Sequence, residues 1–240
     1  AAARALGVPA DRLHLRRRHT GSPDGDRYRR LASGGERFPV RERDLRFLVD
    51  LDDFLDTGLF SDHRETRRRV RAEAAGRDFL NLFCYTGAFS CAAAAGGARG
   101  TTSVDRNTEY LAWLEENLAL NGLARPGHTV VHADVVEYLD RLVEGTKRFG
   151  LAVVDPPSFS RNRGPTGGFE VERDHPRLLA QVMAVLVPGG VAYFSTNHQR
   201  FEPRFEGLDV AESIVEITPD SIPEDYRNRH VHRCWRIVRG

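Results

Sequence analysis

From residue 78 onward, short apolar segments alternate with longer segments of helical character. The apolar segments predict strands at 79–83, 101–104, 129–132, 151–154 and 191–195, and those between them predict helices at 88–95, 108–121, 135–143 and 173–186. Strands that alternate with helices at this spacing form a parallel sheet with right-handed crossovers. The pattern therefore predicts an α/β, doubly wound, Rossmann-like fold.

The last two apolar segments, 213–217 and 232–238, have only a short, turn-rich connection between them. Because no helical crossover fits after Pro223, we expect them to pair as an antiparallel hairpin at the sheet edge. The complete prediction is a seven-stranded, mostly parallel sheet with a C-terminal antiparallel hairpin. This ending is typical of class I methyltransferases, and the absence of a GxGxxG pattern argues against a dinucleotide dehydrogenase.

The front of the chain differs from the rest in pattern and in charge. Turn signals lie at 21–25 and 33–35, and strand candidates lie at 13–17 and 45–51. They predict a small β-rich extension over residues 1–55, before a main domain at 56–240. An Arg-rich helix is expected over 62–75. Residues 1–71 carry 17 Arg against 12 Asp and Glu, a charge balance that suits a polyanion such as RNA.

Specific arginines follow from this charge distribution. The candidates for RNA contact are Arg16, Arg17, Arg18, Arg67 and Arg68. Lys147 is the only lysine, so a general preference for arginine is an alternative explanation of the basic runs. Three cysteines, none in a CxxC pair, predict neither a disulfide framework nor a zinc site. No apolar run approaches the roughly 20 residues of a membrane span, so we expect none. The few, scattered cysteines favour a cytoplasmic protein, and we expect no bound metal.

Polar residues and a glycine follow three of the predicted strands. The turn Phe83–Gly87 leads from a strand into a helix, whose N-terminus favours a carboxylate, and Gly87 lets a ligand approach the backbone closely. Asp105 follows the second strand, where an acidic side chain can accept hydrogen bonds from both ribose hydroxyls. Asp134 follows the third strand and suits an adenine amino group. Helix capping is the alternative role for both aspartates, and Asn107 is a further cap candidate.

The strongest single motif is Asp155-Pro156-Pro157-Ser158-Phe159, after the apolar strand 151–154. Two prolines remove backbone donors and restrict the chain, so the carbonyl groups of the turn stay free to face an amine or a base edge. Phe159 can stack on a base taken out of its helix. The simpler alternative is a rigid loop with a capping aspartate.

Several of these segments together resemble a known family. The segments are Asp56 to Arg64, Asn81 to Phe89, Gly97-Ala98-Arg99, Asn117 to Leu123, Asp155 to Phe159, Arg227-Asn228-Arg229 and Cys234-Trp235. Together they are similar to the large-subunit (23S) ribosomal RNA methyltransferases, in particular to the guanine-N7 half of a bifunctional member. The resemblance implies that S-adenosylmethionine is the cofactor and S-adenosylhomocysteine the product. The implied cofactor-binding set is Arg64, Asn81, Phe83, Tyr85, Thr86, Gly87, Asp105, Arg106, Asn107, Asp134 and Asp155.

The resemblance also implies the roles of these residues and the partners. Asp105 holds the ribose, Asp134 lies near the adenine, and Asp155 and the Phe83–Gly87 turn surround the methionine portion, while Asp62-His63-Arg64 closes over the cofactor. The partners are ribosomal RNA and a covalently linked half with a THUMP module and a guanine-N2 methyltransferase domain, so the chain is either an excised domain or a stand-alone homologue.

The expected reaction is methylation of guanine N7, which carries a free lone pair and needs no general base. Proximity and orientation then supply most of the acceleration. The catalytic candidates are Asp155, Pro156, Pro157 and Phe159, which we expect to position the base. One alternative is cytosine-C5 methylation, which requires a thiolate, for which Cys234 is the candidate. Others are a non-catalytic RNA-binding or assembly module and an enzyme for small molecules or proteins.

Overall fold

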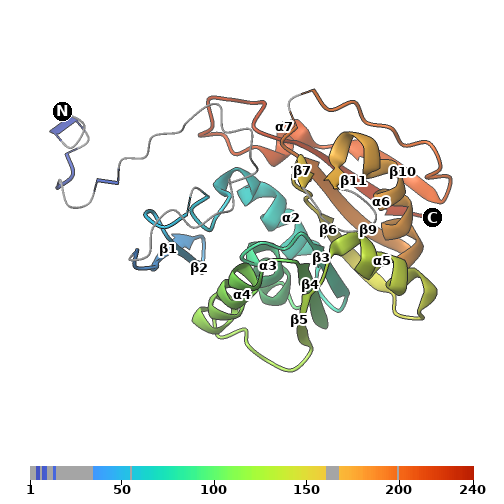
Figure 1. Ribbon diagram of the computed structural model, residues 1–240, viewed down its shortest axis with the longest axis horizontal. Coiled ribbons are helices and arrows are strands. Elements are labelled where there is room, and N and C mark those ends of the chain that lie inside the picture. The colour runs from blue at the N-terminus through green and yellow to red at the C-terminus, as the bar shows by residue number, and fades with distance from the viewer. Residues whose placement is uncertain are drawn as a thin grey trace.

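The computed structural model describes residues 4–5, 7–9, 13–14, 35–54, 56–160, 168–198 and 200–240, apart from the side chain of Ser160. Within these residues the main sheet has seven strands in the order β10-β11-β9-β6-β3-β4-β5 (Figure 1). Its strands are β3 (Asp78–Leu82), β4 (Gly100–Asp105), β5 (His128–His132), β6 (Phe149–Val154), β9 (Leu186–Thr196), β10 (Ala211–Glu216) and β11 (Arg233–Arg239). The strands β5, β4, β3, β6 and β9 pair in parallel, whereas β11 is antiparallel to both β9 and β10. The predicted fold class, including the C-terminal antiparallel pair, is confirmed.

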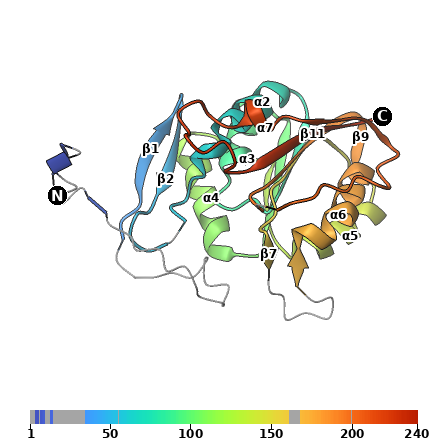
Figure 2. The same ribbon diagram turned by 90° about the horizontal axis from the view of Figure 1, so that it is seen from above.

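Helices cover both faces of this sheet. They are α2 (Arg64–Glu73), α3 (Ala88–Ala95), α4 (Thr108–Leu120), α5 (Val135–Glu144), α6 (Val171–Val185) and the short α7 (Thr218–Ser221), with a 3-10 turn η3 (Ser61–His63) before α2. Figure 2 shows α3 and α4 on one side of the sheet and α5 and α6 on the other. None of the helices in the described ranges combines the length and the apolar character needed to cross a bilayer.

Alternation of side chains along the strands explains this layering. In β6, Leu151 and Val153 point into the cluster that contains Val70 of α2 and Phe89 of α3. The residues between them, Ala152 and Val154, point into the cluster under α5 and α6. Successive side chains of a strand face opposite sides of the sheet, so a continuous apolar strand buries both faces.

The boundaries of β9 differ from the expectation. The helix predicted to end at Leu186 ends at Val185, and β9 begins at Leu186, five residues before the predicted start. Pro188 and Gly189 lie in this first part, where the pairing with β6 is irregular between Phe149 and Leu151. Because proline lacks the donor that a regular ladder needs, the apolar pattern alone could not reveal this extension.

The front of the chain contains a hairpin of β1 (Phe38–Glu42) and β2 (Leu45–Val49). It packs on α4: the Asn117 side chain accepts a hydrogen bond from the Leu48 amide at 2.8 Å, and the Trp113 indole donates to the Leu48 carbonyl at 3.1 Å. Residues 13 and 14 are outside any strand, and 15–17 lie outside the described residues. The division of the chain at residue 55 stays a prediction.

Candidate active site

Four strands of the sheet end side by side where the candidate residues lie. Strand β3 lies between β4 and β6, and β9 lies beyond β6. The chain proceeds from β3 to β4 and β5 on one side, and then returns to β6 on the other. Doubly wound sheets bind ligands outside the carboxyl ends of their strands at such a reversal of strand order. Residues that follow β4, β3, β6 and β9 therefore surround one site.

The turn after β3 has an unusual backbone. Phe83, Tyr85 and Gly87 all have positive φ angles, of 57°, 50° and 76°. Bulky residues avoid this region, so the surrounding contacts must stabilise it. The Tyr85 hydroxyl donates to the Asp56 carbonyl and accepts from the Gly58 amide, both at 2.9 Å, and the Thr86 hydroxyl donates to the Gly58 carbonyl at 2.6 Å. Residues 56–58 thus hold the turn in place.

Asp105, the last residue of β4, accepts two backbone hydrogen bonds. Its Oδ2 atom accepts from the Tyr85 amide at 3.0 Å and its Oδ1 atom accepts from the Asn107 amide at 2.9 Å. Burial raises the pKa of this carboxyl, and these amides oppose the effect. The carboxylate is therefore oriented before any ligand binds, and it lies against the turn after β3, as a group for a ribose diol requires.

Gly87 and Asn81 have structural contacts that the sequence did not indicate. A Cβ atom on Gly87 would lie 2.2 Å from Cγ of Leu114, so this glycine also permits α4 to pack closely. Asn81 is buried and donates to the Ser90 hydroxyl at 2.8 Å, which joins β3 to α3. Their roles in cofactor binding stay predictions.

Two of the other candidates are helix caps. Asn107 accepts from the amides of Glu109 and Tyr110 at the start of α4, and Asp134 accepts from the Val136 and Glu137 amides at the start of α5. The capping alternative therefore applies to both, and a contact between Asp134 and the adenine stays a prediction. Arg106 is exposed.

The Asp155 turn follows β6 as expected and is supported from β9. The Ser195 hydroxyl donates to Oδ1 of Asp155 at 2.7 Å, and the Ser158 hydroxyl donates to the Asn197 side chain at 2.8 Å. Pro156 is buried and Pro157 is half-buried. Phe159 begins an unpredicted two-stranded ribbon of β7 (Phe159–Ser160) and β8 (Phe169–Glu170), and its side chain is 57% exposed.

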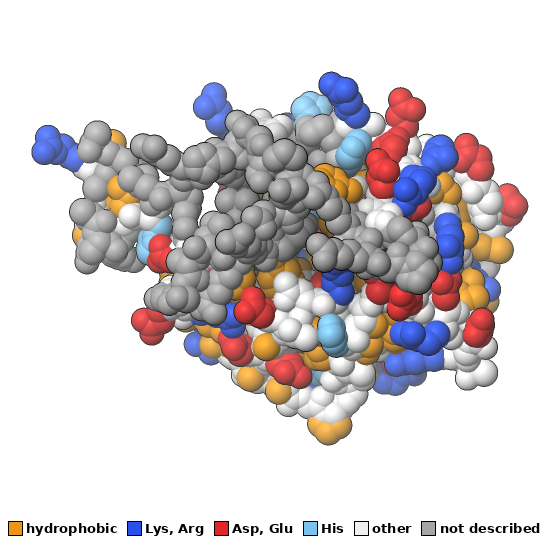
Figure 3. Space-filling view, viewed as in Figure 1, with side chains coloured by type: hydrophobic (Ala, Val, Ile, Leu, Met, Phe, Trp, Pro, Cys, Tyr) orange, Lys and Arg blue, Asp and Glu red, His pale blue; other side chains and the backbone are white. Residues whose placement is uncertain are grey.

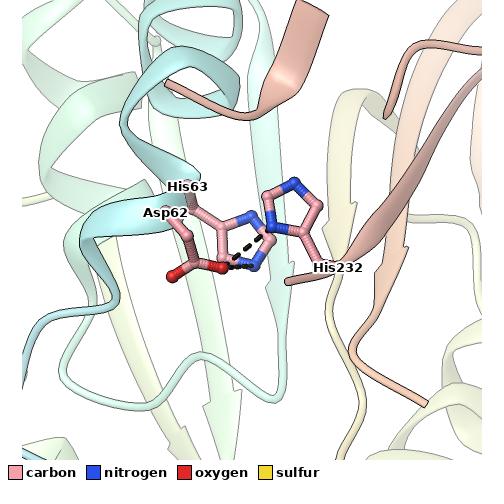
Figure 4. Close-up of side chains that lie close together, drawn as sticks. All are labelled: Asp62, His63 and His232. Carbon is pink, nitrogen blue, oxygen red and sulfur yellow. Dashed lines mark hydrogen bonds and ion pairs between the residues drawn. The ribbon is translucent and has the colours of Figure 1, made fainter. Parts of the chain in front are cut away.

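Next to this turn lies a cluster of the partly buried Asp62 and the buried His63 and His232 (Figure 4). The two imidazole rings stack with centroids 4.2 Å apart and an interplanar angle of 11°. Nδ1 of His232 lies 2.8 Å from Oδ2 of Asp62, while Nε2 of His63 lies 3.6 Å from Oδ2 of Asp155 and 3.8 Å from Oδ2 of Asp62. Sequence reasoning missed both histidines as a pair, because 169 positions separate them.

Hydrogen bonding and burial indicate how this cluster carries charge. The Ser221 hydroxyl donates to the Thr218 carbonyl at 2.9 Å and also lies 2.9 Å from Nε2 of His232. The other ring nitrogen, Nδ1, faces the Asp62 carboxylate. Burial alone would raise the pKa of Asp62, but the hydrogen bond from His232 and the charges of both histidines lower it to about 2. Burial lowers the pKa of His63, and the neighbouring carboxylates of Asp155 and Asp62 oppose this effect.

The same three residues have donor atoms within 4.8 Å of one another, close enough for a metal ion. Lone pairs of imidazole lie in the ring plane, so two nearly parallel stacked rings do not aim theirs at one point. Both nitrogens of His232 are also engaged at hydrogen-bond distance. We therefore interpret the cluster as a hydrogen-bonded network.

The three cysteines are all buried. Burial raises the pKa of Cys91 to about 12, and it raises the pKa values of Cys84 and Cys234 as well. Cys234, the candidate nucleophile for cytosine-C5 chemistry, is 0% exposed on β11. A thiol that is neither exposed nor easily ionised is a poor nucleophile, so the structure does not favour the thiolate mechanism.

The predicted RNA-contacting arginines differ in their environments. Arg67 is 3% exposed and its guanidinium donates to both carboxylate oxygens of Glu42, at 2.6 and 2.7 Å, so it is unavailable to a phosphate. Arg68 is exposed and pairs with Glu65 at 2.8 Å, and Arg64 pairs with Asp225 at 2.7 Å. Arg16, Arg17 and Arg18 lie outside the described residues.

Comparisons with known proteins identify the group that this site suits. The sequence model of the S-adenosylmethionine-dependent methyltransferases matches residues 2–218. A protein described as a methyltransferase and solved in complex with SAH shares 29% identity, with a TM-score of 0.73, over 86% of this chain and 57% of that one.

Curated relatives are more similar in sequence. "Ribosomal RNA large subunit methyltransferase K/L" of Pseudomonas aeruginosa is 45% identical over 97% of this chain and 31% of the relative. "Ribosomal RNA large subunit methyltransferase K" of Neisseria meningitidis serogroup B is 40% identical over 99% of this chain and 66% of the relative. This chain thus spans about a third of the longer relative and about two thirds of the shorter one.

The residues present fit the cofactor of that family. Asp105 offers two oriented carboxylate oxygens beside a turn with positive φ angles, and Asp155 directly follows β6, the other strand next to β3. The sequence match covers most of the chain, and the strand order places these groups around one edge of the sheet. This chain belongs to the family of S-adenosylmethionine-dependent methyltransferases.

Proposed function

We propose that this methyltransferase modifies guanine N7 in large-subunit (23S) ribosomal RNA. The names of relatives at 40–45% identity support ribosomal RNA as the substrate class. The observation that carries the proposal is the arrangement of the strand ends, in which Asp105 on β4 and Asp155 after β6 flank the turn after β3. A cofactor in that turn would have its ribose on the Asp105 side and its reactive end on the Asp155 side.

Roles for the binding residues follow from their positions. We assign the ribose to Asp105, the adenine to the region of Asp134, and the methionine portion to the Phe83–Gly87 turn with Asp155. When bound, S-adenosylmethionine supplies a methyl group activated by a sulfonium centre. The chain's own contribution is to orient the two reactants, which is the main requirement when the acceptor atom carries no proton.

Guanine N7 has a free lone pair, so its methylation releases no proton and requires no general base. The Asp155-Pro156-Pro157 turn then positions the base, with the Asp155 carboxylate itself oriented by Ser195. The exposed ring of Phe159 is available for stacking on the base. Methylation at N7 makes the base positively charged, and an oriented carboxylate at the end of β6 stabilises that charge as it develops.

A first experiment separates cofactor binding from the choice of target atom. Calorimetric titration with S-adenosylmethionine and S-adenosylhomocysteine measures binding, and transfer of a labelled methyl group to ribosomal RNA, followed by nucleoside analysis, identifies the product. We expect binding of both compounds and label in 7-methylguanosine. Label in 5-methylcytidine would contradict the choice of guanine N7, and failure to bind either compound would contradict the enzymatic function.

Substitution of Asp155 tests its positioning role. We expect Asp155→Ala to lower the rate of methyl transfer about 100-fold, because an oriented charge next to the acceptor base is lost. The fold should survive, since the substitution removes one hydrogen bond from the Ser195 hydroxyl, worth about 1 kcal/mol, and a longer contact of 3.6 Å with His63. The control is Asp209→Ala, at an exposed residue before β10. Circular dichroism and thermal unfolding verify the fold, and near-normal turnover by Asp155→Ala would remove this residue from the mechanism.

A further inference from the structure

Most arginines near the candidate site already have acidic partners. Arg64 pairs with Asp225, Arg67 with Glu42, and Arg71 with Asp44. Where Figure 3 shows described side chains, acidic and basic groups are interspersed. A phosphate that binds a paired arginine must displace its carboxylate. An arginine without such a partner releases only water and counterions when it binds a phosphate. Its contact with RNA therefore contributes more to the binding free energy.

One unpaired arginine lies on the loop between α7 and β11. Three contacts anchor this loop, residues 222–232, beside the active site: the Asp225–Arg64 ion pair at 2.7 Å, the Tyr226–Ser61 hydroxyl contact at 2.5 Å, and the His232–Asp62 pair at 2.8 Å. Arg227, next to the anchored Tyr226, is exposed. Within the part of the chain that the structure describes, its guanidinium makes no hydrogen bond or ion pair. Figure 1 shows this loop extending beyond the N-terminal end of α2.

A second unpaired arginine lies on the loop after β9. Asn197 in this loop accepts from Ser158 of the Asp155 turn, and buried Phe201 accepts from the Arg233 side chain through its carbonyl, at 3.0 Å. Arg200 lies between these two anchors and is exposed. Among the contacts of the described residues, none pairs its guanidinium. Arg233 pairs with Thr196 across β11 and β9, so the end of the 222–232 loop lies next to the start of the loop after β9.

We propose that Arg200 and Arg227 bind phosphates of the RNA strand on either side of the target nucleotide. This inference rests on the proposed function, because it requires an RNA substrate. Their loops are fixed to the Asp155 turn on one side and to the Asp62–His232 pair on the other, so the two cations flank the position assigned to the base. The fork of the guanidinium matches a phosphate in two hydrogen bonds. These residues replace Arg67 in the expected RNA interface.

Salt dependence of RNA binding is the measurement that tests this surface. The variants are Arg200→Ala, Arg227→Ala and the double variant in the full chain. A matched control is Arg141→Ala, which removes another exposed and unpaired arginine, in the last turn of α5. Helix α5 begins near the carboxyl ends of the parallel strands and runs back toward their amino ends. Arg141, in its last turn, therefore lies away from the candidate site.

The logarithm of the association constant for RNA falls linearly with the logarithm of the salt concentration. We expect each single variant to reduce the steepness of this fall by about 0.7, the value for one phosphate contact to a single strand, and to weaken RNA binding about fivefold. Calorimetric affinity for S-adenosylhomocysteine should not change, and Arg141→Ala should bind RNA as the unaltered chain does. If the unaltered chain methylates RNA and both variants keep its salt slope, the inference is overturned while the proposed function stands. An equal loss with Arg141→Ala overturns it too, since binding would follow net charge alone. Absence of RNA binding and methylation by the unaltered chain overturns both.

Discussion

At the scale of single residues, the turn after β3 shows how strain and packing determine one amino acid. Gly87 has φ of 76° and opens α3, and the space that a Cβ atom would occupy is filled by Leu114 of α4. Gly122, after α4, has φ of 66°, but no other atom lies within 4 Å of the position that its Cβ would take. The two glycines therefore share a backbone requirement and differ in packing.

This difference predicts two unequal substitutions. Gly122→Ala should lower the free energy of unfolding by about 1 kcal/mol, the effect of a left-handed conformation on a residue with a Cβ atom. Gly87→Ala should lower it by a further 1–3 kcal/mol, approximately, because the added carbon overpacks against Leu114. Urea denaturation of both variants measures the difference. Equal losses would show that Leu114 can move aside at little cost.

At the scale of secondary-structure elements, the Asp62–His232 pair joins η3 to the loop that leads into β11. Both partners are largely buried, and His232 also stacks on His63. The neighbouring Asp225–Arg64 pair joins the same two segments at the surface, where Asp225 is 61% exposed. Buried ion pairs are strongly destabilising to break, because one charge stays behind without a partner, whereas exposed pairs contribute little.

We expect Asp62→Asn to lower the free energy of unfolding by about 2 kcal/mol at pH 7, since the buried His232 ring loses a charged hydrogen-bond partner. The matched control, Asp225→Asn, should have a much smaller effect. The pKa of Asp62 is lowered from 3.8 to about 2 in the folded chain, so its contribution is complete above about pH 4 and is lost as pH falls through 2. Urea denaturation between pH 7 and 2 should therefore show a loss of stability in that window that Asp62→Asn lacks. The same pH profile in both proteins would contradict the ion pair.

At the scale of the whole molecule, this chain spans 31% of its Pseudomonas aeruginosa relative, so most of that relative lies outside the match. The residues that we propose to contact the cofactor lie at the strand ends of one sheet. Binding of RNA depends instead on charged surface, and most of the basic groups near the site are neutralised by acidic neighbours.

We therefore predict that the isolated chain binds S-adenosylhomocysteine normally but methylates bare ribosomal RNA weakly. Covalent linkage to an RNA-binding module should raise kcat/KM for RNA through effective concentration, with no change in cofactor affinity. Labelled methyl transfer by the isolated and linked forms, at two salt concentrations, makes the comparison. Full activity of the isolated chain at physiological salt would contradict this expectation.

The amino-acid sequence was sufficient to predict the α/β class, the seven-strand sheet with its antiparallel ending, and the positions of Asp105 and Asp155 at strand ends. These features follow from local periodicity and from short connections, which leave few topologies open. The sequence did not indicate the two-stranded ribbon at Phe159 or the early start of β9. Strands of two residues and an irregular, Pro-containing pairing leave no periodic pattern.

The folded structure, by contrast, shows which polar groups are already bonded to other residues. It stacked His63 on His232 across 169 positions, buried Arg67 against Glu42, enclosed all three cysteines, and left Arg200 and Arg227 unpaired within the described residues. The physical reason is that the availability of a charge or a thiol depends on its neighbours in space. A sequence motif specifies the chemistry of a side chain, whereas burial and pairing with distant residues decide whether a ligand can reach it.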